Sequence, residues 1–386
     1  MEIKPITAEH LDAYRHIVSH SFERGMGSEI TAEKLVEHER LGVFEDGRLH
    51  ASLRILDFQM FFGEERRPCG GIAGVACEPA ARGRGYAGAL MNRSLELMRE
   101  RGQYLSSLWP FSFDYYRNYG WEWVGPGHRY KVPLALLPAQ EDTRFVEPLF
   151  EDIPAVLNPA YERFAVRYNG MLVRDDRRWE SFQRVWDNRA HSIFVYRRDG
   201  GIEGYAKVKY KEKEEEAEAS EFVALTNRAY RGLLGVFRRY GMTVKTIEWR
   251  AAPDDPLWSI LCHWDVETKL EPQGMSRIVD LKPALEALRP NLSLSGSASI
   301  AIQDEKAPWN TGTWRLSTDS GAVDVRADSG DAGVTIDIQA LTQVYWGSPS
   351  LDWLRKAGKI EVRKESDYDL LRLLLPARPV LLLDGF

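Results

Sequence analysis

Apolar and polar residues alternate along the first part of the chain with two different periods. A period of two, typical of half-buried strands, covers 41–45 and 49–60, with the turn residues Asp46 and Gly47 between them. An apolar run at 72–77 predicts a buried strand. Beyond it the apolar residues recur three and four apart, as on one face of a helix. These residues are Ala87, Leu90, Met91, Leu95 and Met98.

Other elements complete this first block. A strand at 1–5, a helix that begins at Thr7 and a second helix over 31–40 precede the strands. A turn at 66–70 then leads into the buried run. The resulting order, with helices before and after the strands, indicates an α/β fold.

A second block repeats the order of strand, turn and helix at 221–225 and 228–240, after a linker at 130–147 that is rich in Pro and Leu. The remaining elements predicted in this block are helices at 153–167 and 177–188 and strands at 192–197 and 202–211. The charged run at 211–218 is typical of a solvated hairpin or loop.

From Gly274 onward, short alternating segments rich in Ser, Gly and Asp precede three helical patterns. The predicted strands are 292–303, 312–317, 322–327 and 334–338, and the predicted helices are 338–346, 350–357 and 366–375. An antiparallel sheet followed by helices is an α+β domain. We therefore predict three domains, at 1–144, 145–273 and 274–386.

Composition narrows the functional class. The 386 residues are 44% hydrophobic and 28% charged, as in an ordinary globular protein, and the net charge of −6 argues against nucleic acid as a partner. Three cysteines without metal-ligand spacing, a polar N-terminus and the lack of a membrane-length apolar run predict a cytoplasmic protein that binds neither metal nor membrane. His16 and His20 are four residues apart on a predicted helix, but no third ligand accompanies them.

The turn between the buried strand and its helix reads Arg82-Gly83-Arg84-Gly85-Tyr86-Ala87. Glycines let successive backbone N–H groups point into one concavity, and the first helical turn adds further unpaired donors. With two arginines, such a turn suits a pyrophosphate. The glycine spacing also matches a dinucleotide fingerprint formally, yet the preceding strand ends in Cys-Glu-Pro and no acidic residue follows at the required position. A plain surface turn is the other alternative.

The pattern Arg82-x-x-Gly85-x-Ala87 resembles the coenzyme A loop of the GNAT acetyltransferases, Gln/Arg-x-x-Gly-x-Gly/Ala. The resemblance implies an acetyl-CoA site formed by residues 82–87 together with the backbone of Val75, Ala76 and Cys77, which would polarise the thioester carbonyl. In the second block, Thr226-Asn227-Arg228 stands where glycines are needed. That block is therefore interpreted as a degenerate GNAT domain that has lost the cofactor.

An aromatic segment at 113–122 is similar to the signature that closes a GNAT domain. Aligned on Gly120, the tyrosine of that signature is Tyr116. A phenol with an ordinary pKa near ~10 suits protonation of a leaving thiolate at neutral pH. We interpret Tyr115 and Tyr119 as packing residues.

The whole chain, which ends in an apolar segment and Phe386, resembles the Eis (enhanced intracellular survival) acetyltransferase family. The resemblance implies a sterol carrier protein-like third domain, a homohexamer, and a terminal carboxylate that enters the first domain's active site. Phe386 would be the general base and Tyr116 the general acid. An α-carboxylate, with a pKa of about 3.5, is a weak base. It needs the burial that apolar residues 380–383 offer, or it takes its proton late, from the more acidic nitrogen of the tetrahedral intermediate. A tail docked only for stability is the alternative.

The acceptor of the acetyl group is the least determined feature. Phe22 and Trp109 are candidates for walls of its site, and Glu23, Asp114 and Asp384 for binding ammonium groups, although each also fits ordinary surface or packing. The family resemblance implies aminoglycosides or polyamine-like amines. Two alternatives stay open: acetylation of protein lysine or N-terminal amines, and a non-catalytic protein that binds an apolar ligand.

Overall fold

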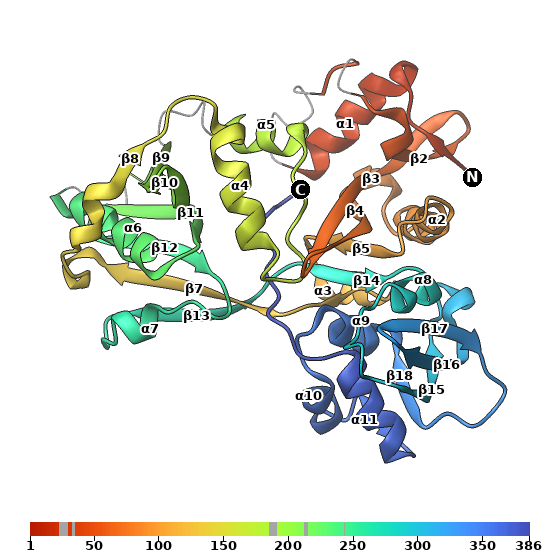
Figure 1. Cartoon of the computed structure of the whole chain (residues 1–386). Helices are drawn as coiled ribbons and strands as arrows, with labels where there is room; N and C mark the ends of the chain where they lie inside the picture. The colour runs from red at the N-terminus through yellow and green to blue at the C-terminus, as the bar shows by residue number, and fades with distance from the viewer. Residues whose placement is uncertain (23–29, 33–34, 185–190, 212–214, 243) are drawn as a thin grey trace.

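The structure, a computed structural model, describes residues 1–22, 30–32, 35–184, 191–211, 215–242 and 244–386, and it has three lobes (Figure 1). Two lobes are α/β sheets with helices packed on them, and the third is an α+β domain. The predicted fold class is confirmed. None of the described helices is long and apolar enough to cross a membrane.

The first lobe is built on a seven-stranded sheet with the order β1-β2-β3-β4-β5-β14-β6. Its strands are β1 (Glu2–Pro5), β2 (Arg40–Glu45), β3 (Arg48–Phe62), β4 (Glu65–Cys77), β5 (Leu105–Leu108), β6 (Glu122–Trp123) and β14 (Met275–Ile278). Its helices are α1 (Leu11–Ser21), α2 (Tyr86–Glu100) and α3 (Phe113–Arg117). The apolar face predicted for α2 packs against β3 and β4 and is fully buried at Leu90, Met91, Leu95 and Met98.

The second lobe has a seven-stranded sheet with the order β13-β7-β12-β11-β10-β9-β8. Its strands are β7 (Pro126–Pro133), β8 (Val146–Pro148), β9 (His191–Arg198), β10 (Gly201–Lys211), β11 (Glu216–Ala224), β12 (Thr246–Ala251) and β13 (Glu267–Pro272). Its helices are α4 (Ile153–Ala165), α5 (Asp176–Arg184), α6 (Asn227–Arg239) and α7 (Leu257–Ile260). Strand β11 pairs in parallel with β12 and leads into α6, just as β4 pairs with β5 and leads into α2. The internal repeat is therefore present in the fold.

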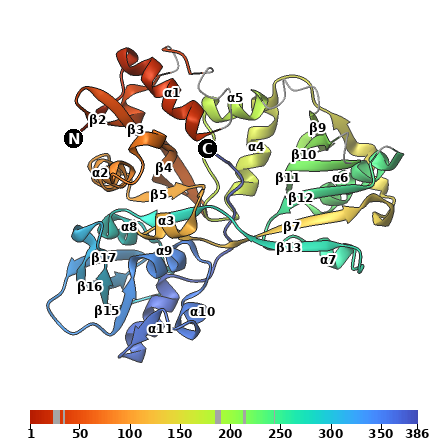
Figure 2. The ribbon, with the colours of Figure 1, turned by 180° about the vertical axis from the view of Figure 1, so that it is seen from behind.

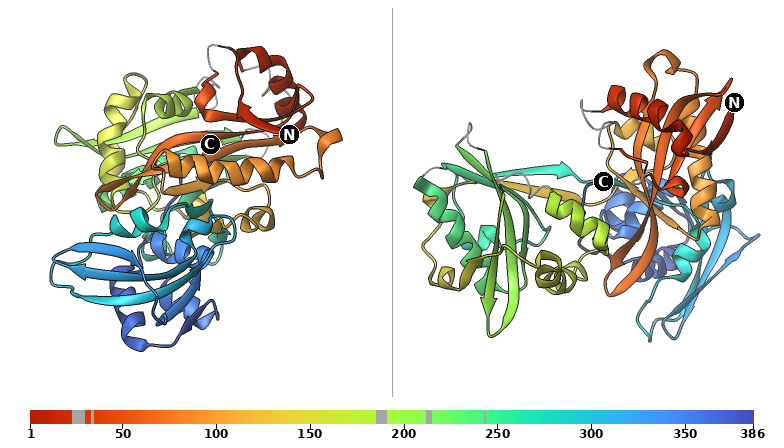
Figure 3. Two further views of the ribbon diagram at one scale, coloured as in Figure 1. Left: turned by 90° about the vertical axis from the view of Figure 1, so that its right-hand side faces the viewer. Right: turned by 90° about the horizontal axis from the view of Figure 1, so that it is seen from above.

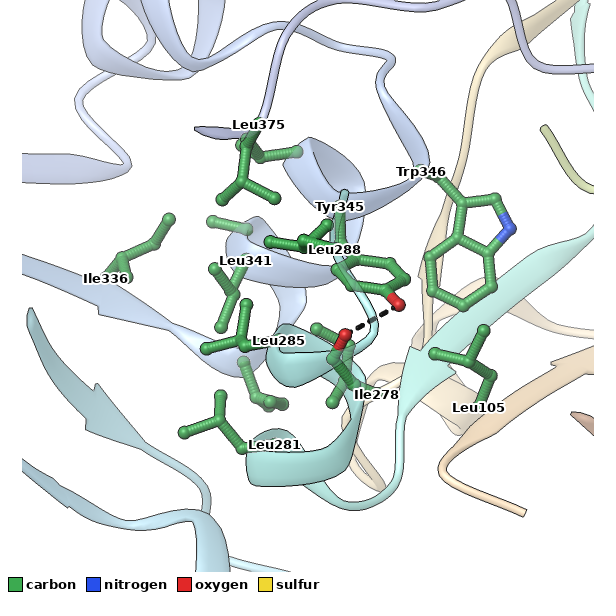
Figure 4. Packing of buried hydrophobic residues seen from close by; sticks show 14 of the residues in the cluster. Leu105, Ile278, Leu281, Leu285, Leu288, Ile336, Leu341, Tyr345, Trp346 and Leu375 are labelled. Atoms are coloured by element: carbon green, nitrogen blue, oxygen red, sulfur yellow. Dashed lines mark hydrogen bonds between the residues drawn. The ribbon is translucent and has the colours of Figure 1, made fainter. Parts of the chain in front are cut away.

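The third lobe has a five-stranded sheet with the order β17-β16-β15-β18-β19. Its strands are β15 (Gly296–Gln303), β16 (Gly312–Asp319), β17 (Ala322–Ala327), β18 (Val334–Asp337) and β19 (Ile360–Val362), and its helices are α8 (Leu281–Glu286), α9 (Ile338–Trp346), α10 (Leu351–Lys356) and α11 (Glu365–Leu374). Leucines and isoleucines of the helices and sheet fill its core, where the Tyr345 hydroxyl donates to the carbonyl of Ala284 at 2.9 Å (Figure 4). The sheet is mixed and not wholly antiparallel as predicted, because β18 runs parallel to β15.

Two local predictions in the first block are wrong. Of the predicted helix at 31–40, the described part forms only a 3-10 turn at Glu37–Glu39, and Arg40 already belongs to β2. The predicted turn at 66–70 lies inside β4, whose hairpin turns at Gly63 instead. Gly70 and Gly71 are required for close packing, since an added Cβ would lie 2.3 Å from the Met98 sulfur or 2.2 Å from the Phe58 ring.

The strands interleave across the ranges predicted for the domains. Strand β7, placed by the sequence in 1–144, pairs with β12 and β13 of the second sheet. Strand β14 then returns the chain to the first sheet, between β5 and β6. The chain thus enters the second lobe through β7 and returns to the first lobe through β14.

The last residues leave the third lobe and run between the other two, so the C-terminus lies close to β3, α4 and α5 (Figures 2 and 3). The backbone of Asn169 holds this tail by accepting from Leu381 at 3.1 Å and donating to Pro379 at 3.0 Å. The Gln273 side chain donates to the Val380 carbonyl and accepts from the Leu382 N–H. The tail therefore contacts the segment between β8 and β9 and the residue that follows β13.

Candidate functional site

The first sheet opens beside β4. In the described structure, β4 pairs with β5 only from Cys69 opposite Leu105 to Ile72 opposite Leu108, although β4 continues to Cys77. Beyond Ile72, the backbone N–H groups of β4 on the side of β5 consequently have no acceptor in β5 and are available to a ligand. On its other edge β4 bulges, since two residues lie opposite Leu53 of β3, and Gly74 takes a φ of +58°.

The glycine turn after β4 is open. Gly83 and Gly85 both have φ +82°, and no atom lies within 4 Å of a Cβ added at either position. Gly85 is the N-cap of α2 and leaves the first helical turn without a side-chain cap. The free N–H donors and the helix dipole fit a pyrophosphate. Glycine is needed at position 88 for close packing instead, because a Cβ added there would lie 2.6 Å from the Tyr119 hydroxyl.

The other residues of the predicted acetyl-CoA loop occupy distinct places. Arg82 is exposed and donates to the Cys77 carbonyl at 3.4 Å. Arg84 and the Tyr86 hydroxyl both bind the Glu45 carboxylate, at 2.8 and 2.6 Å. Arg84 therefore has an acidic partner of its own besides any phosphate. Burial raises the pKa of the half-buried Cys77 thiol, which weighs against a role for it as a nucleophile.

Tyr116 lies on α3, which begins where the Ser112 side chain accepts from the backbone N–H of Tyr115. Only 3% of Tyr116 is exposed, and the rings of Phe111 and Tyr115 pack edge-on against it. Burial raises its pKa above the usual value for a tyrosine. The phenol therefore stays protonated at neutral pH, which suits a proton donor and excludes a general base.

The terminal residue packs against the first sheet. The ring of Phe386 meets that of Phe58 edge-on at 4.7 Å, and a Cβ on Gly71 would lie 3.0 Å from it. Two residues earlier, Asp384 is held from both neighbouring lobes. The Trp109 indole donates to its carbonyl at 2.9 Å, and Arg174 and the Tyr161 hydroxyl bind its carboxylate at 2.9 and 3.1 Å.

Arg174 is the centre of this anchor. Its side chain is 1% exposed, binds both oxygens of Glu221 on β11, and lies over the Tyr161 ring at 4.0 Å. Burial opposes its charge, but the carboxylates of Asp384 and Glu221 outweigh burial and hold the pKa of Arg174 above its ordinary value. The tail is thus fixed by a buried network that belongs to the second lobe.

A cavity of about 650 Å³ lies between α1, β3, β4, α5 and the tail, and Ala73, Gly74, Gly385 and Phe386 line it. Of the residues predicted for the acceptor, Phe22 lines this cavity. Glu23 lies outside the described residues. Trp109 holds the tail instead of lining the cavity. Asp114 is 94% exposed on α3 and pairs with Arg117 at 3.1 Å, also away from the lining.

Several residues of this region were missed from the sequence. They are Glu39, Arg54, Arg174, Arg177 and Arg178. The signal was the run Arg174-Asp-Asp-Arg177-Arg178-Trp179, where arginines stand beside an aromatic residue. Among the residues described, no group of three His, Cys, Asp or Glu side chains is placed to hold a metal ion.

The structure thus places an open glycine turn between the end of β4 and the start of α2, where the resemblance to the coenzyme A loop predicts it. Comparison of the sequence with known protein families also identifies acetyltransferase domains. Residues 2–124 and 170–278 each match an acetyltransferase (GNAT) domain, and residues 281–382 match a sterol carrier protein domain.

Relatives extend over the whole chain. An uncharacterized N-acetyltransferase of Streptomyces avermitilis is 23% identical over 88% of this chain and 86% of its own. The structure of a GCN5-related N-acetyltransferase from Anabaena variabilis has a TM-score of 0.90 at 21% identity and 100% coverage of both chains. Eis1 from Mycobacterium abscessus has a TM-score of 0.81, also at 21% identity and full coverage of both chains. The protein is therefore a GNAT N-acetyltransferase, and its whole fold is similar to that of Eis1.

Proposed function

We propose that the enzyme transfers an acetyl group from acetyl-CoA directly to a primary amine, with Tyr116 as general acid and the α-carboxylate of Phe386 as general base. The observation that carries the proposal is that Phe386 lines the same cavity as Ala73 and Gly74 of β4. The residue that carries the terminal carboxylate and the strand proposed to bind the thioester therefore line one cavity, which supports the proposal.

In this proposal acetyl-CoA supplies the acetyl group as a thioester. The β4 backbone around Val75–Cys77 donates to the thioester oxygen, and the turn at Gly83 and Gly85 holds the pyrophosphate. As the C–N bond forms and the C–S bond breaks, the amine proton passes to the Phe386 carboxylate. Tyr116 gives its proton to the leaving thiolate. No acyl-enzyme is needed, so Cys77 has no chemical role.

The acceptor is proposed to be a small molecule. A cavity of about 650 Å³ lies within the usual range for small-molecule sites, roughly 300–1,000 Å³. Aminoglycosides and polyamines, predicted from the family resemblance, stay the first compounds to try, with a lysine peptide as the alternative. The homohexamer likewise stays a prediction.

Release of coenzyme A in the steady state tests the mechanism, with calorimetric binding of acetyl-CoA measured in parallel. Tyr116→Phe and deletion of residues 384–386 should each lower kcat by roughly 10²–10⁴-fold while acetyl-CoA still binds. Tyr115→Phe, which removes the hydroxyl of the neighbouring tyrosine, is the matched control and should retain activity. Full activity after the deletion would refute the terminal base.

A further inference from the structure

The described lining of the cavity that contains Phe386 holds arginine and acidic side chains in equal number, and a polycationic acceptor would need acidic groups that are not already paired. Four arginines line it, namely Arg40, Arg54, Arg177 and Arg178. The acidic side chains in the same lining are Glu39, Asp57, Asp175 and Glu180. Which of these charges are already paired decides what the cavity can bind.

Glu39 is committed to two arginines. Its side chain is 3% exposed and accepts from Arg54 at 3.1 Å and from Arg177 at 2.7 Å. Burial would raise its pKa, but the two guanidinium groups hold that pKa below the ordinary value, so Glu39 is ionised. One carboxylate offsets only one of two guanidinium charges, and this cluster therefore keeps a net positive charge.

Other polar groups of the lining also have partners. Asp57 accepts from the side-chain amide of Gln103 at 3.0 Å. Asp175 caps α5 by accepting from the backbone N–H of Arg178 at 2.9 Å. Arg40 donates to the Val36 carbonyl at 3.1 Å. These groups are structural parts of the wall.

Arg178 differs from them. Its guanidinium lies over the Phe58 ring at 4.2 Å and at 5.6 Å from the centre of the Phe386 ring, and it makes no hydrogen bond or ion pair with any described residue. Burial lowers its pKa, and the charges of Arg54 and Arg177 lower that pKa further against the effect of Asp384 and Asp175. None of its side-chain nitrogens is fully buried without a partner, so the five N–H donors stay open to the cavity and can bind an anion there.

We propose that the acceptor carries, besides its amine, an anionic oxygen group that binds Arg178. This inference rests on the proposed acetyl transfer but changes its substrate class: amino acid-like or aminoalkyl phosphate compounds take the place of aminoglycosides and polyamines, which carry no anionic oxygen group. A guanidinium holds a carboxylate or phosphate through two parallel hydrogen bonds. Arg178 lies over the Phe386 ring. An acceptor whose anionic group binds Arg178 can therefore keep its amine in the same cavity, near the terminal residue.

Three acceptors that share one amine and one six-carbon chain provide the test: 6-aminohexanoate, hexane-1,6-diamine and hexylamine. The wild-type enzyme should have its highest kcat/KM with 6-aminohexanoate. In Arg178→Gln, the ratio of kcat/KM for 6-aminohexanoate to that for the diamine should fall by about 10- to 100-fold. Arg178→Lys, which keeps a positive charge, should lower this ratio less than Arg178→Gln does. Arg163→Gln, at an exposed arginine on α4, is the matched control and should leave the ratio unchanged.

The outcomes separate this inference from the mechanism on which it rests. If Arg178 only supports Phe386, all three acceptors lose activity equally and the inference is overturned, while acetyl transfer stands. Higher kcat/KM for the diamine also overturns it. If nothing is acetylated, calorimetric titration of 6-aminohexanoate becomes the deciding test. Binding to the wild type that is lost in Arg178→Gln supports the anion site without turnover. Equal binding to both proteins, or no binding to either, refutes it. Repeating the titration with an aminoalkyl phosphate shows whether phosphate replaces carboxylate.

Discussion

The two GNAT lobes share a fold but differ at the N-terminus of one helix. In the first lobe, Gly85 precedes α2 with φ +82° and no side chain caps the helix. In the second lobe, the Thr226 hydroxyl accepts from the Ala229 N–H at 3.2 Å and donates to Glu203 at 2.7 Å. In the second lobe one of the N–H donors of the first helical turn is thus bound by the capping side chain, and the Glu203 carboxylate lies beside it.

The second lobe nevertheless uses the corresponding part of its sheet. Strand β11 pairs with β12 only as far as Ala219, and Glu221 lies in the unpaired stretch beyond. Where β4 offers free backbone groups, β11 thus carries one half of the ion pair that holds Asp384. The second lobe, which is predicted to bind no cofactor, thus holds the segment that carries the proposed base of the other lobe.

The largest effect is expected from the anchor. Arg174→Met would leave Glu221 and Asp384 buried without their shared cation and should lower the free energy of unfolding by ~3–5 kcal/mol. Urea denaturation measures this, and kcat should fall while acetyl-CoA affinity is kept. Arg163→Met, on the surface of α4, serves as control. Wild-type stability in Arg174→Met would show that the network does not hold the tail.

A pH effect distinguishes the two acid–tyrosine pairs at the helix starts. Glu45 has its pKa lowered, chiefly by the Tyr86 hydrogen bond, whereas burial raises the pKa of Asp255, the partner of Tyr230, to about 6. The folded state therefore holds the Asp255 proton more tightly than the unfolded state, and this stabilisation is lost as pH rises from about 4 to about 6. It amounts to roughly 3 kcal/mol.

Asp255→Asn isolates that contribution. The free energy of unfolding of the wild type, minus that of the variant, should decline across this pH window when both are measured by urea denaturation. A difference independent of pH would mean that Asp255 titrates normally in the folded protein.

The next effect concerns the cofactor turn. Gly85→Val forces a β-branched residue into a left-handed conformation and fills the concavity, so acetyl-CoA should bind at least about tenfold more weakly. Calorimetry measures this directly. Asn227→Gly in the second lobe should create no acetyl-CoA site, since Thr226 and Glu203 still occupy the helix end. Unchanged affinity in Gly85→Val would place the pyrophosphate elsewhere.

The smallest effect is expected at the second helix cap. Thr226→Ala should cost about 1 kcal/mol of stability, because it removes the acceptor for the Ala229 N–H. Thermal unfolding detects such a change, and acetyl-CoA affinity should not move. A loss of acetyl-CoA binding would contradict the assignment of the cofactor to the first lobe alone.

Local features were readable from the sequence because they depend on neighbouring residues. The helical face of α2, the left-handed glycines of its turn and the missing glycines at 226–228 all follow from spacing within about one turn. The aromatic spacing aligned on Gly120 likewise placed Tyr116 on a short helix, and its burial followed from packing. Where packing outweighed local pattern, prediction failed, as at 31–40 and at the packing glycines Gly70 and Gly71.

The three-domain α/β and α+β architecture and the open turn of the first lobe could therefore be predicted from the sequence. The surroundings of Phe386 could not, because they form only when distant segments of the chain pack together. Arg174 and Trp109 lie 210 and 275 positions from Asp384 along the chain, and Arg178 reaches the cavity from the other GNAT lobe. No periodicity encodes such contacts, because burial of shared apolar surface between lobes, and not local backbone preference, brings these residues together.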